Sequence, residues 1–276
     1  MEDCVRIVQE HYDSDVQYEW DRLERHPFEF AITTKMMDRY IKPGDRILDI
    51  GGGPGRYSIY YAQKGCDVTL VDLSAENVRF ALQKSKELDV SIKAISGDAR
   101  EVSEFIKGKF DHVFVMGPMY HLLEEKDRIK ALNEAISLLK DRGMIYVSFI
   151  LMFAGMIFGM KTSPEMLLLE SEQIFIDAVI NGKSYAGDAF TKAFFIDQKS
   201  IIPFMDRFHL EKKHLFGQEG ILAPCELNFL SQPQEVIDKW VAIAEQLCER
   251  EELLSYSEHA MYIGQRIPYG ELYNKE

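Results

Sequence analysis

The chain has little cysteine and no closely spaced cysteine pair. Its four cysteines lie far apart in 276 residues, at Cys4, Cys66, Cys225 and Cys248. A disulfide framework or a cysteine zinc site would need closer, paired spacings. We therefore expect reduced thiols and a cytoplasmic protein.

Clustered basic charge is also lacking. The chain has 32 Lys and Arg against 45 Asp and Glu, which gives a net charge of −13, and no basic run stands out. Because such a balance repels a polyanion, a nucleic acid is not expected as substrate or partner. No cluster of His, Asp and Glu with metal-ligand spacing stands out either, so no metal site is predicted.

One stretch lacks charge altogether. Residues 143–160 carry no charged side chain over 18 positions, which approaches the length of a membrane span. Its first half is rich in β-forming residues and follows a turn at 141–143, as a buried parallel strand would. We expect a strand followed by an apolar helix or loop at 151–160, and no membrane partner. The acidic, polar start of the chain does not look like a secretory signal.

The chain is organised around a glycine turn that follows the apolar segment 46–50. Gly51, Gly53 and Gly55 sit two positions apart, so the backbone can adopt positive φ and approach a ligand closely. Residues 56–63 then read as a helix, whose first amide groups point towards the turn. This strand, turn and helix predict a ligand cradle.

A second predicted strand, 67–71, ends at Asp72, which is about 20 positions after the first glycine, where nucleotide-binding α/β folds place a ribose-binding acid. The offset fits NAD and S-adenosylmethionine equally well. Two residues favour the latter. Arg56 stands where the pyrophosphate fingerprint needs a third glycine or alanine, and Asp49 suits a cationic ligand better than a pyrophosphate.

The run from Asp49 to Gly55 resembles motif I of the class I S-adenosylmethionine-dependent methyltransferases. Asp72 matches that family's ribose-binding acid, and Gly97-Asp98-Ala99 matches the motif that flanks the adenine. The resemblance covers about residues 40–150, and it implies S-adenosylmethionine as cofactor. The cofactor-binding residues that it implies are Asp49, Gly51, Gly52, Gly53, Gly55, Asp72, Leu73, Asp98, Ala99, Met116 and Gly117.

Strands and helices alternate from residue 46 onward, which predicts a doubly wound, mostly parallel α/β sheet of the Rossmann-like type. The resemblance implies seven strands, the last two forming a reversed hairpin at the sheet edge. We expect an N-terminal helical arm (1–40), a cofactor-binding core (41–150), a helical cap inserted after strand five (151–200) and the remainder of the core (201–276).

The boundaries of several elements can be predicted from the sequence. Ser74 is expected to cap a helix at 75–88, and Gly143 to end a helix at 124–140. Pro27 should open a helix that runs to Tyr40. Further elements are expected as strands at 91–95, 110–116, 210–216 and 260–265, and as helices at 199–208 and at 233–249, the last capped by Ser231.

The arm is rich in aromatic residues. Tyr12, Tyr18 or Trp20 could close over the cofactor, as the arm does in the relatives that the chain resembles, or the arm could simply pack on the sheet edge. In the cofactor site we include Tyr18 and Trp20.

Catalysis is expected where strand four ends, at Met116 and Gly117. Methyl transfer is an in-line displacement that depends on alignment. His121 could accept the acceptor's proton, and Tyr120 could orient the acceptor; a purely structural role for His121 is the alternative. The Asn- or Asp-Pro-Pro pattern of enzymes that methylate base amino groups is absent here.

The sequence thus predicts a methyltransferase that acts on a small molecule with a hydrophobic body, at an oxygen or nitrogen atom. An NAD-dependent oxidoreductase and a non-catalytic S-adenosylmethionine-binding interaction protein are the alternatives. The acceptor and the oligomeric state stay open.

Overall fold

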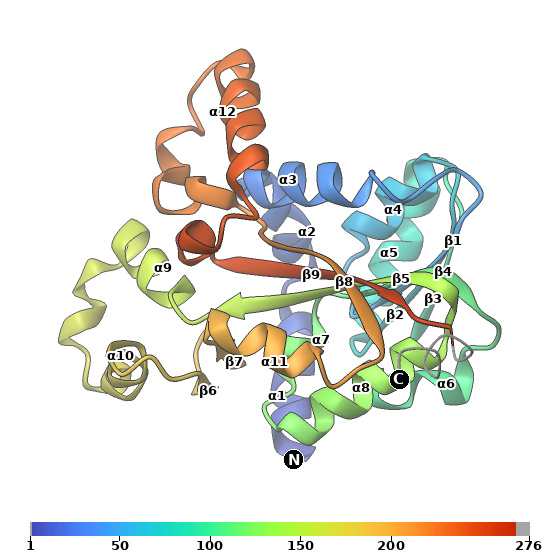
Figure 1. Ribbon diagram of the computed structural model, residues 1–276, viewed down its shortest axis with the longest axis horizontal. Helices are drawn as coiled ribbons and strands as arrows, with labels where there is room; N and C mark the ends of the chain where they lie inside the picture. The colour runs from blue at the N-terminus through green and yellow to red at the C-terminus, as the bar shows by residue number, and fades with distance from the viewer. Residues whose placement is uncertain (1, 269–276) are drawn as a thin grey trace, which may run out of the picture.

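The computed structural model describes residues 2–268, and its centre is a mixed sheet (Figure 1). Parallel strands lie in the order β3-β2-β1-β4-β5, and β9 and then β8 continue the sheet antiparallel beyond β5. Their bounds are Arg46–Ile50 (β1), Asp67–Asp72 (β2), Ile92–Ser96 (β3), Phe110–Val115 (β4), Leu139–Leu151 (β5), Leu210–Gly217 (β8) and His259–Arg266 (β9). This arrangement confirms the predicted doubly wound fold, including its reversed hairpin.

Helices cover both faces of the sheet because the strands are apolar on both. In β1, Ile47 packs into one core cluster, whereas Leu48 and Ile50 pack into the other. The first face is covered by α3 (Pro27–Met37), α4 (Arg56–Gln63), α5 (Ala75–Glu87) and α12 (Gln234–Leu247), and the second by α6 (Val102–Phe105), α8 (Glu125–Ser137) and α11 (Ile201–Met205).

The insertion after β5 was predicted to be helical, but it is only partly so. It contains α9 (Ala154–Thr162) and α10 (Gln173–Ile180), but then a hairpin of β6 (Tyr185–Asp188) and β7 (Lys192–Ile196). β7 pairs in parallel with the last two residues of β5, so the described sheet has nine strands rather than seven. The cap is therefore hydrogen-bonded into the sheet.

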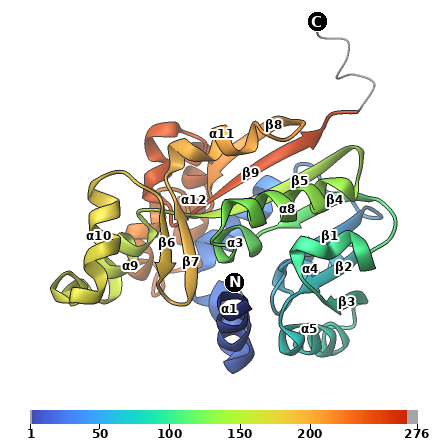
Figure 2. The same ribbon diagram turned by 90° about the horizontal axis from the view of Figure 1, so that it is seen from below.

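Helix α1 (Glu2–Ser14) lies between the cap and the core (Figure 2). It contacts α5 on one side and β7 on the other. The arm continues through α2 (Val16–Arg25), capped by Asp15, into α3, which starts at Pro27 as predicted and ends at Met37 rather than Tyr40.

Two predicted boundaries around β5 were wrong. Helix α8 ends at Ser137, and Leu139 already pairs with Phe110 of β4. A register irregularity follows, with Arg142 at a φ of 60°, so Gly143 lies inside the strand instead of ending the helix. Local propensity favoured a longer helix, but pairing with β4 prevails.

The later helices also differ from the prediction. Helix α12 begins at Gln234 with Pro233 at its N-cap position, and Ser231 does not cap it. A helix was predicted at 199–208. The structure has a 3-10 turn at Gln198–Ser200 followed by the short helix α11, which ends at Met205.

The uncharged segment 143–160 divides between β5 and α9, as predicted. No helix in the described part of the chain is long and apolar enough to cross a membrane. The four cysteines are free thiols.

Ser74 caps α5 as predicted, and its side chain joins two elements. Its Oγ accepts a hydrogen bond from the Asn77 amide (3.0 Å) and donates one to Asp13 of α1. Replacing Ser74 with Ala should lower the free energy of unfolding by about 1 to 2 kcal/mol, because the cap is lost. Denaturant titration measures this, with Ser91→Ala, an exposed serine before β3, as the control. Equal stability of both variants would contradict the capping role.

Candidate functional site

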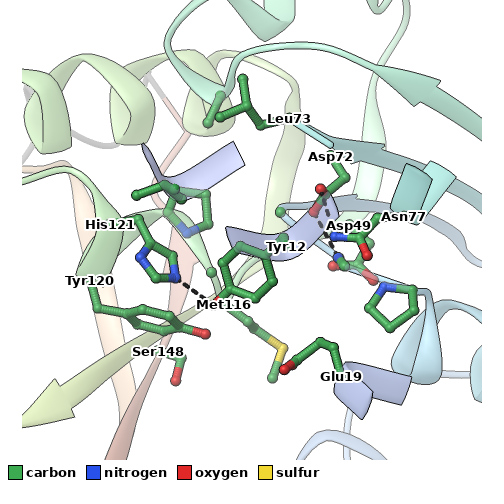
Figure 3. Close-up of a pocket in the computed structure, with 18 of the residues that line it drawn as sticks. Tyr12, Glu19, Asp49, Asp72, Leu73, Asn77, Met116, Tyr120, His121 and Ser148 are labelled. Atoms are coloured by element: carbon green, nitrogen blue, oxygen red, sulfur yellow. Dashed lines mark hydrogen bonds between the residues drawn. The ribbon is translucent and has the colours of Figure 1, made fainter. Parts of the chain in front are cut away.

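A cavity opens at the carboxyl ends of β1, β2 and β4 (Figure 3). The parallel pairing of these strands brings together residues that are far apart in the sequence. Among the predicted site residues, those that line the cavity are Asp49, Gly51, Gly52, Gly53, Asp72, Leu73, Asp98, Ala99, Met116, Gly117, Tyr120 and His121.

The glycine turn is packed tightly against the end of β4. Gly51 has a φ of +73°, and a Cβ atom on it would lie 2.5 Å from Cδ of Pro118. A Cβ atom on Gly117 would lie 2.8 Å from the carbonyl oxygen of Gly51. Both positions therefore need glycine. Gly55 does not line the cavity; its φ of +89° and its contact with Ala81 give it a packing role.

Asp49 has a buried carboxylate, and only one of its two oxygens is hydrogen-bonded. Its side chain is 1% exposed, Oδ2 accepts from the Ser58 hydroxyl (2.8 Å), and Oδ1 has no hydrogen-bond partner. Burial, with a smaller contribution from Asp72, raises the pKa of Asp49 to about 7. A buried carboxyl group in this state favours a ligand with a cationic or donor group.

Asp72 is held in place by three donors. Its carboxylate accepts from the amides of Gly53 (2.8 Å) and Ser74 (2.9 Å) and from the Asn77 side chain (3.1 Å). Burial raises the pKa of Asp72, and these hydrogen bonds oppose the rise. The acid thus links the end of β2 to the glycine turn.

Asp98 lines the cavity, but its carboxylate is already engaged. Arg100 donates to it through its backbone amide (2.8 Å) and through its guanidinium (2.6 Å to Nη2). Burial alone would raise the pKa of Asp98, but the Arg100 hydrogen bonds lower it below its usual value. The neighbouring Ala99 opens a 3-10 turn at the same edge.

His121 is hydrogen-bonded to the arm. The hydroxyl of Tyr12 lies 2.7 Å from Nε2 of His121, and Nδ1 lies 3.2 Å from the carbonyl oxygen of Lys192. Because a carbonyl only accepts, Nδ1 carries the proton and Nε2 accepts from Tyr12. Burial lowers the pKa of His121 to about 4, so the ring is neutral near pH 7. The ring of Tyr120 packs edge-on against it.

Two arm residues predicted for the cofactor site do not line this cavity. Trp20 is buried between Phe80 and the guanidinium of Arg56, which lies 4.5 Å from its ring centre. Tyr18 is 61% exposed and lines the neighbouring cavity instead. The arm residues that do line the first cavity are Val5, Val8, Tyr12, Glu19, Arg22, Leu23 and Glu29.

A second, larger cavity adjoins the first. Its volume is about 580 Å³ against about 150 Å³, and the cap supplies much of its apolar wall. The residues that line both cavities are Tyr12, Glu19, Arg22, Glu29, Tyr120 and His259. Two ligands, one bound in each cavity, would therefore come close to each other beside the shared residues Tyr12 and Tyr120.

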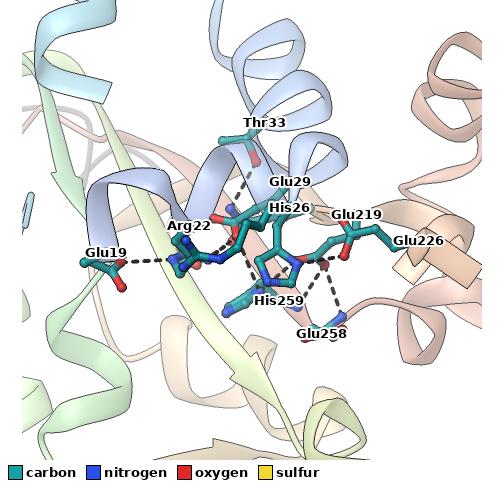
Figure 4. A network of polar contacts seen from close by, with 12 residues as sticks. Glu19, Arg22, His26, Glu29, Thr33, Glu219, Glu226, Glu258 and His259 are labelled. Atoms are coloured by element: carbon teal, nitrogen blue, oxygen red, sulfur yellow. Dashed lines mark hydrogen bonds and ion pairs between the residues drawn. The ribbon is translucent and has the colours of Figure 1, made fainter. Parts of the chain in front are cut away.

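Charged residues from several helices, loops and β9 form a largely buried network along the second cavity (Figure 4). Arg22 donates to both oxygens of Glu29 (2.5 and 3.2 Å) and to Glu19 (2.9 Å). Nδ1 of His259 lies 2.7 Å from Glu219. Burial alone would lower the pKa of His259, but Glu219 and Glu29 together raise it to about 9.

Glu29, Glu219 and His259 place potential metal-ligand atoms within 4.8 Å of one another. Both oxygens of Glu29, however, accept from Arg22, and His259 is protonated near pH 7. Because these donors and acceptors are already engaged with one another, the arrangement favours ion pairing.

Sequence reasoning missed Glu19, Arg22, Glu29, Ser148 and His259. Arg22 and Glu29 lie on the successive helices α2 and α3, with the chain turning at His26, so no spacing within one helix relates them. His259 and Ser148 reach the first cavity because β9 pairs antiparallel with β5, and no local sequence pattern encodes this pairing.

Comparison with known proteins identifies the central part of the chain. Residues 47–143 match the family model of a methyltransferase domain. The chain is 36% identical over 101 residues to a glycine/sarcosine N-methyltransferase of Aphanothece halophytica, which covers 36% of this chain and 38% of the relative. It is 32% identical over 114 residues to a ubiquinone biosynthesis O-methyltransferase of Xanthomonas campestris, covering 40% and 45%. The matches thus span less than half of these relatives.

The fold resembles that of solved methyltransferases. Magnesium protoporphyrin IX methyltransferase from Synechocystis, solved with bound S-adenosylhomocysteine, matches with a TM-score of 0.57 and 16% identity, over 95% of this chain and 99% of that one. At this identity the match supports the fold alone. The fold confirms the predicted Rossmann-like architecture, and the match of residues 47–143 to a methyltransferase domain supports the predicted class for that part of the chain.

Asp49 should make the stability of the ligand-free protein depend on pH. Its carboxyl group titrates near 3.8 when unfolded and near 7 when folded. Between these values the unfolded state ionises and the folded state does not, so rising pH favours unfolding by up to about 1.4 kcal/mol per pH unit.

The Asp49→Asn variant removes this titration. The free energy of unfolding of the wild type, measured relative to Asp49→Asn, should therefore fall as pH rises from about 4 to about 7. Denaturant titrations at several pH values measure the difference. A constant difference across this range would show that burial does not raise the pKa of Asp49.

Proposed function

We propose that the protein transfers a methyl group from S-adenosylmethionine to a small molecule with a hydrophobic body, since residues 47–143 match a methyltransferase domain. The observation that carries this proposal is Asp49, a buried carboxylate with an unpartnered oxygen beside a glycine turn, at the same strand edge as Asp72. Bound there, the cofactor supplies a methyl group activated by a sulfonium.

The cavity offers a matching group for each part of such a cofactor. Asp49 and the turn at 51–53 suit the cationic methionine end. Asp72 and Leu73 suit the ribose, and Asp98 and Ala99 the adenine, although the bonds of Asp98 to Arg100 leave only part of its carboxylate free. A pyrophosphate would meet the carboxylate of Asp49 in place of a donor, which disfavours NAD.

The second cavity is the proposed acceptor site. It joins the first at Tyr12 and Tyr120, and its wall includes Phe158, Phe175 and Phe195 from the cap and its hairpin. This part of the wall is apolar, so it suits the hydrophobic body of an acceptor. Transfer then requires that the acceptor atom be aligned with the methyl group at the junction of the two cavities.

The proposed role of His121 needs its neighbour Tyr12. With Nε2 engaged, His121 can accept a proton from the acceptor only through the Tyr12 hydroxyl or after that bond breaks. Tyr120, which lines both cavities, is the proposed orienting residue.

Cofactor binding is the first test. Calorimetry should show micromolar affinity for S-adenosylmethionine or S-adenosylhomocysteine. Asp72→Ala should weaken binding by about 1.5 to 3 kcal/mol, the scale of hydrogen bonds to a charged group. Asp67→Ala, at the exposed start of the same strand, is the matched control. Binding of NAD instead, or unchanged affinity of a folded Asp72→Ala variant, would overturn the assignment.

Turnover tests His121. The His121→Ala variant should lower the methyl-transfer rate by roughly 10² to 10⁴ without weakening cofactor binding, and Tyr12→Phe should lower it as well. Because burial lowers the pKa of His121 to about 4, the methyl-transfer rate of the wild type should decline in acid near pH 4, where the ring becomes protonated. His209→Ala, at an exposed histidine, is the control. Near-normal turnover of His121→Ala would make the ring structural.

Cofactor binding without transfer to any acceptor would favour the non-catalytic alternative. Tight binding of a protein partner in the presence of the cofactor would then identify an interaction protein.

A further inference from the structure

Glu226 places a buried carboxylate on the wall of the second cavity. Its side chain is 1% exposed. Oε2 lies 2.7 Å from Nδ1 of His26 and 3.4 Å from Nζ of Lys161, but Oε1 has no hydrogen-bond partner. A buried carboxylate oxygen without a donor is costly, and a ligand that donates a hydrogen bond to it would remove that cost.

The network around Glu226 carries a surplus of negative charge (Figure 4). Its carboxylates are Glu19, Glu29, Glu219, Glu226 and Glu258, and its cations are Arg22, Lys161 and His259. Even with His26 protonated, the acids among these described residues outnumber the cations. The wall is therefore short of positive charge.

The remaining groups of the network are already paired. Arg22 is bound to Glu19 and Glu29, His259 to Glu219, and Lys161 to Glu226 and Glu258. The other arginine on the wall, Arg25, donates to the carbonyl oxygen of Tyr18 and lies over the Tyr18 ring. An anionic ligand near Glu226 would meet the surplus acids of the network. A cationic ligand would instead restore the charge balance, which the low effective dielectric of the site makes more favourable than in water.

Aromatic rings line the same cavity. Tyr18, Phe158, Phe190 and Phe195 are among the wall residues. An ammonium group is attracted to the face of such rings, and a hydrophobic body packs against them. The cavity thus combines a site for positive charge with a surface for apolar atoms.

We propose that the methyl acceptor is an amphiphilic amine. Its protonated amino group binds the free carboxylate oxygen of Glu226 as an anchor, and its hydrophobic body lies along the aromatic wall. A separate, unprotonated oxygen or nitrogen atom, at the junction of the two cavities, receives the methyl group. This rests on the proposed function, because it takes the second cavity as the acceptor site. The amine would supply the donor that Oε1 of Glu226 lacks, and the carboxylate would offset the cost of burying the ammonium.

Matched pairs of probes test the charge requirement. Binding of 2-phenylethylamine and 4-phenylbutylamine is compared with binding of 2-phenylethanol and 4-phenylbutanol, by calorimetry on the full chain saturated with S-adenosylhomocysteine. Each amine should bind about 10- to 100-fold more tightly than its alcohol, the range for hydrogen bonds to charged groups. Equal binding within both pairs, or no binding of any probe, would overturn the proposal.

A substitution tests the residue. Glu226→Gln keeps the shape of the side chain but removes its charge, so it should abolish the preference for the amines while leaving the alcohols unaffected. Glu165→Gln, an exposed acid of the cap outside both cavities, is the matched control and should keep the preference. A preference that persists in Glu226→Gln would overturn the assignment to Glu226.

The tests also separate the two proposals. Binding of S-adenosylhomocysteine to wild type and to Glu226→Gln reports on the proposed function and on folding. If the cofactor product fails to bind the wild type, the proposed function fails. If it binds but amines are not preferred, only the acceptor class is wrong.

Discussion

The parallel pairing of β1 with β2 on one side and with β4 on the other determines where the polar groups of the site lie. Asp49 pairs with Leu70 and with Phe114, so the three strands end at one edge, close to Asp72 and Met116. The close approach of Gly51 to Gly117 follows from the same register. The cavity is thus a product of sheet geometry, and the arm and the cap are built around it.

The sequence predicted those parts of the site that depend on local spacing. The turn at 51–53 and the acid Asp72 belong to a single strand, helix and strand unit, whose period is legible in the chain. The hairpin of β6 and β7 was missed, because a four-residue strand with one glycine has too weak a pattern. The sequence also could not show that Tyr12, and not Trp20, lines the first cavity, since this depends on how α1 and α2 pack.

The charged network illustrates a second limit of sequence reasoning. His259 and Glu29 are far apart in the chain and meet only because β9 inserts between β5 and β8. Buried ion pairs contribute little net stability, since desolvation offsets their attraction. An internally paired but negatively unbalanced cluster such as this one is better understood through what it binds than through what it stabilises.

Tyr12 and Asp13, two consecutive residues of α1, are hydrogen-bonded to segments that follow two different strands of the sheet. Tyr12 bonds to His121 after β4, and Asp13 accepts from Ser74 after β2. A ligand of the first cavity is thus bridged by one turn of helix, whereas the second cavity has its own wall in the cap. The same turn of α1 also reaches the second cavity through His11, Tyr12 and Ser14, so a displacement of this helix would open both cavities at once.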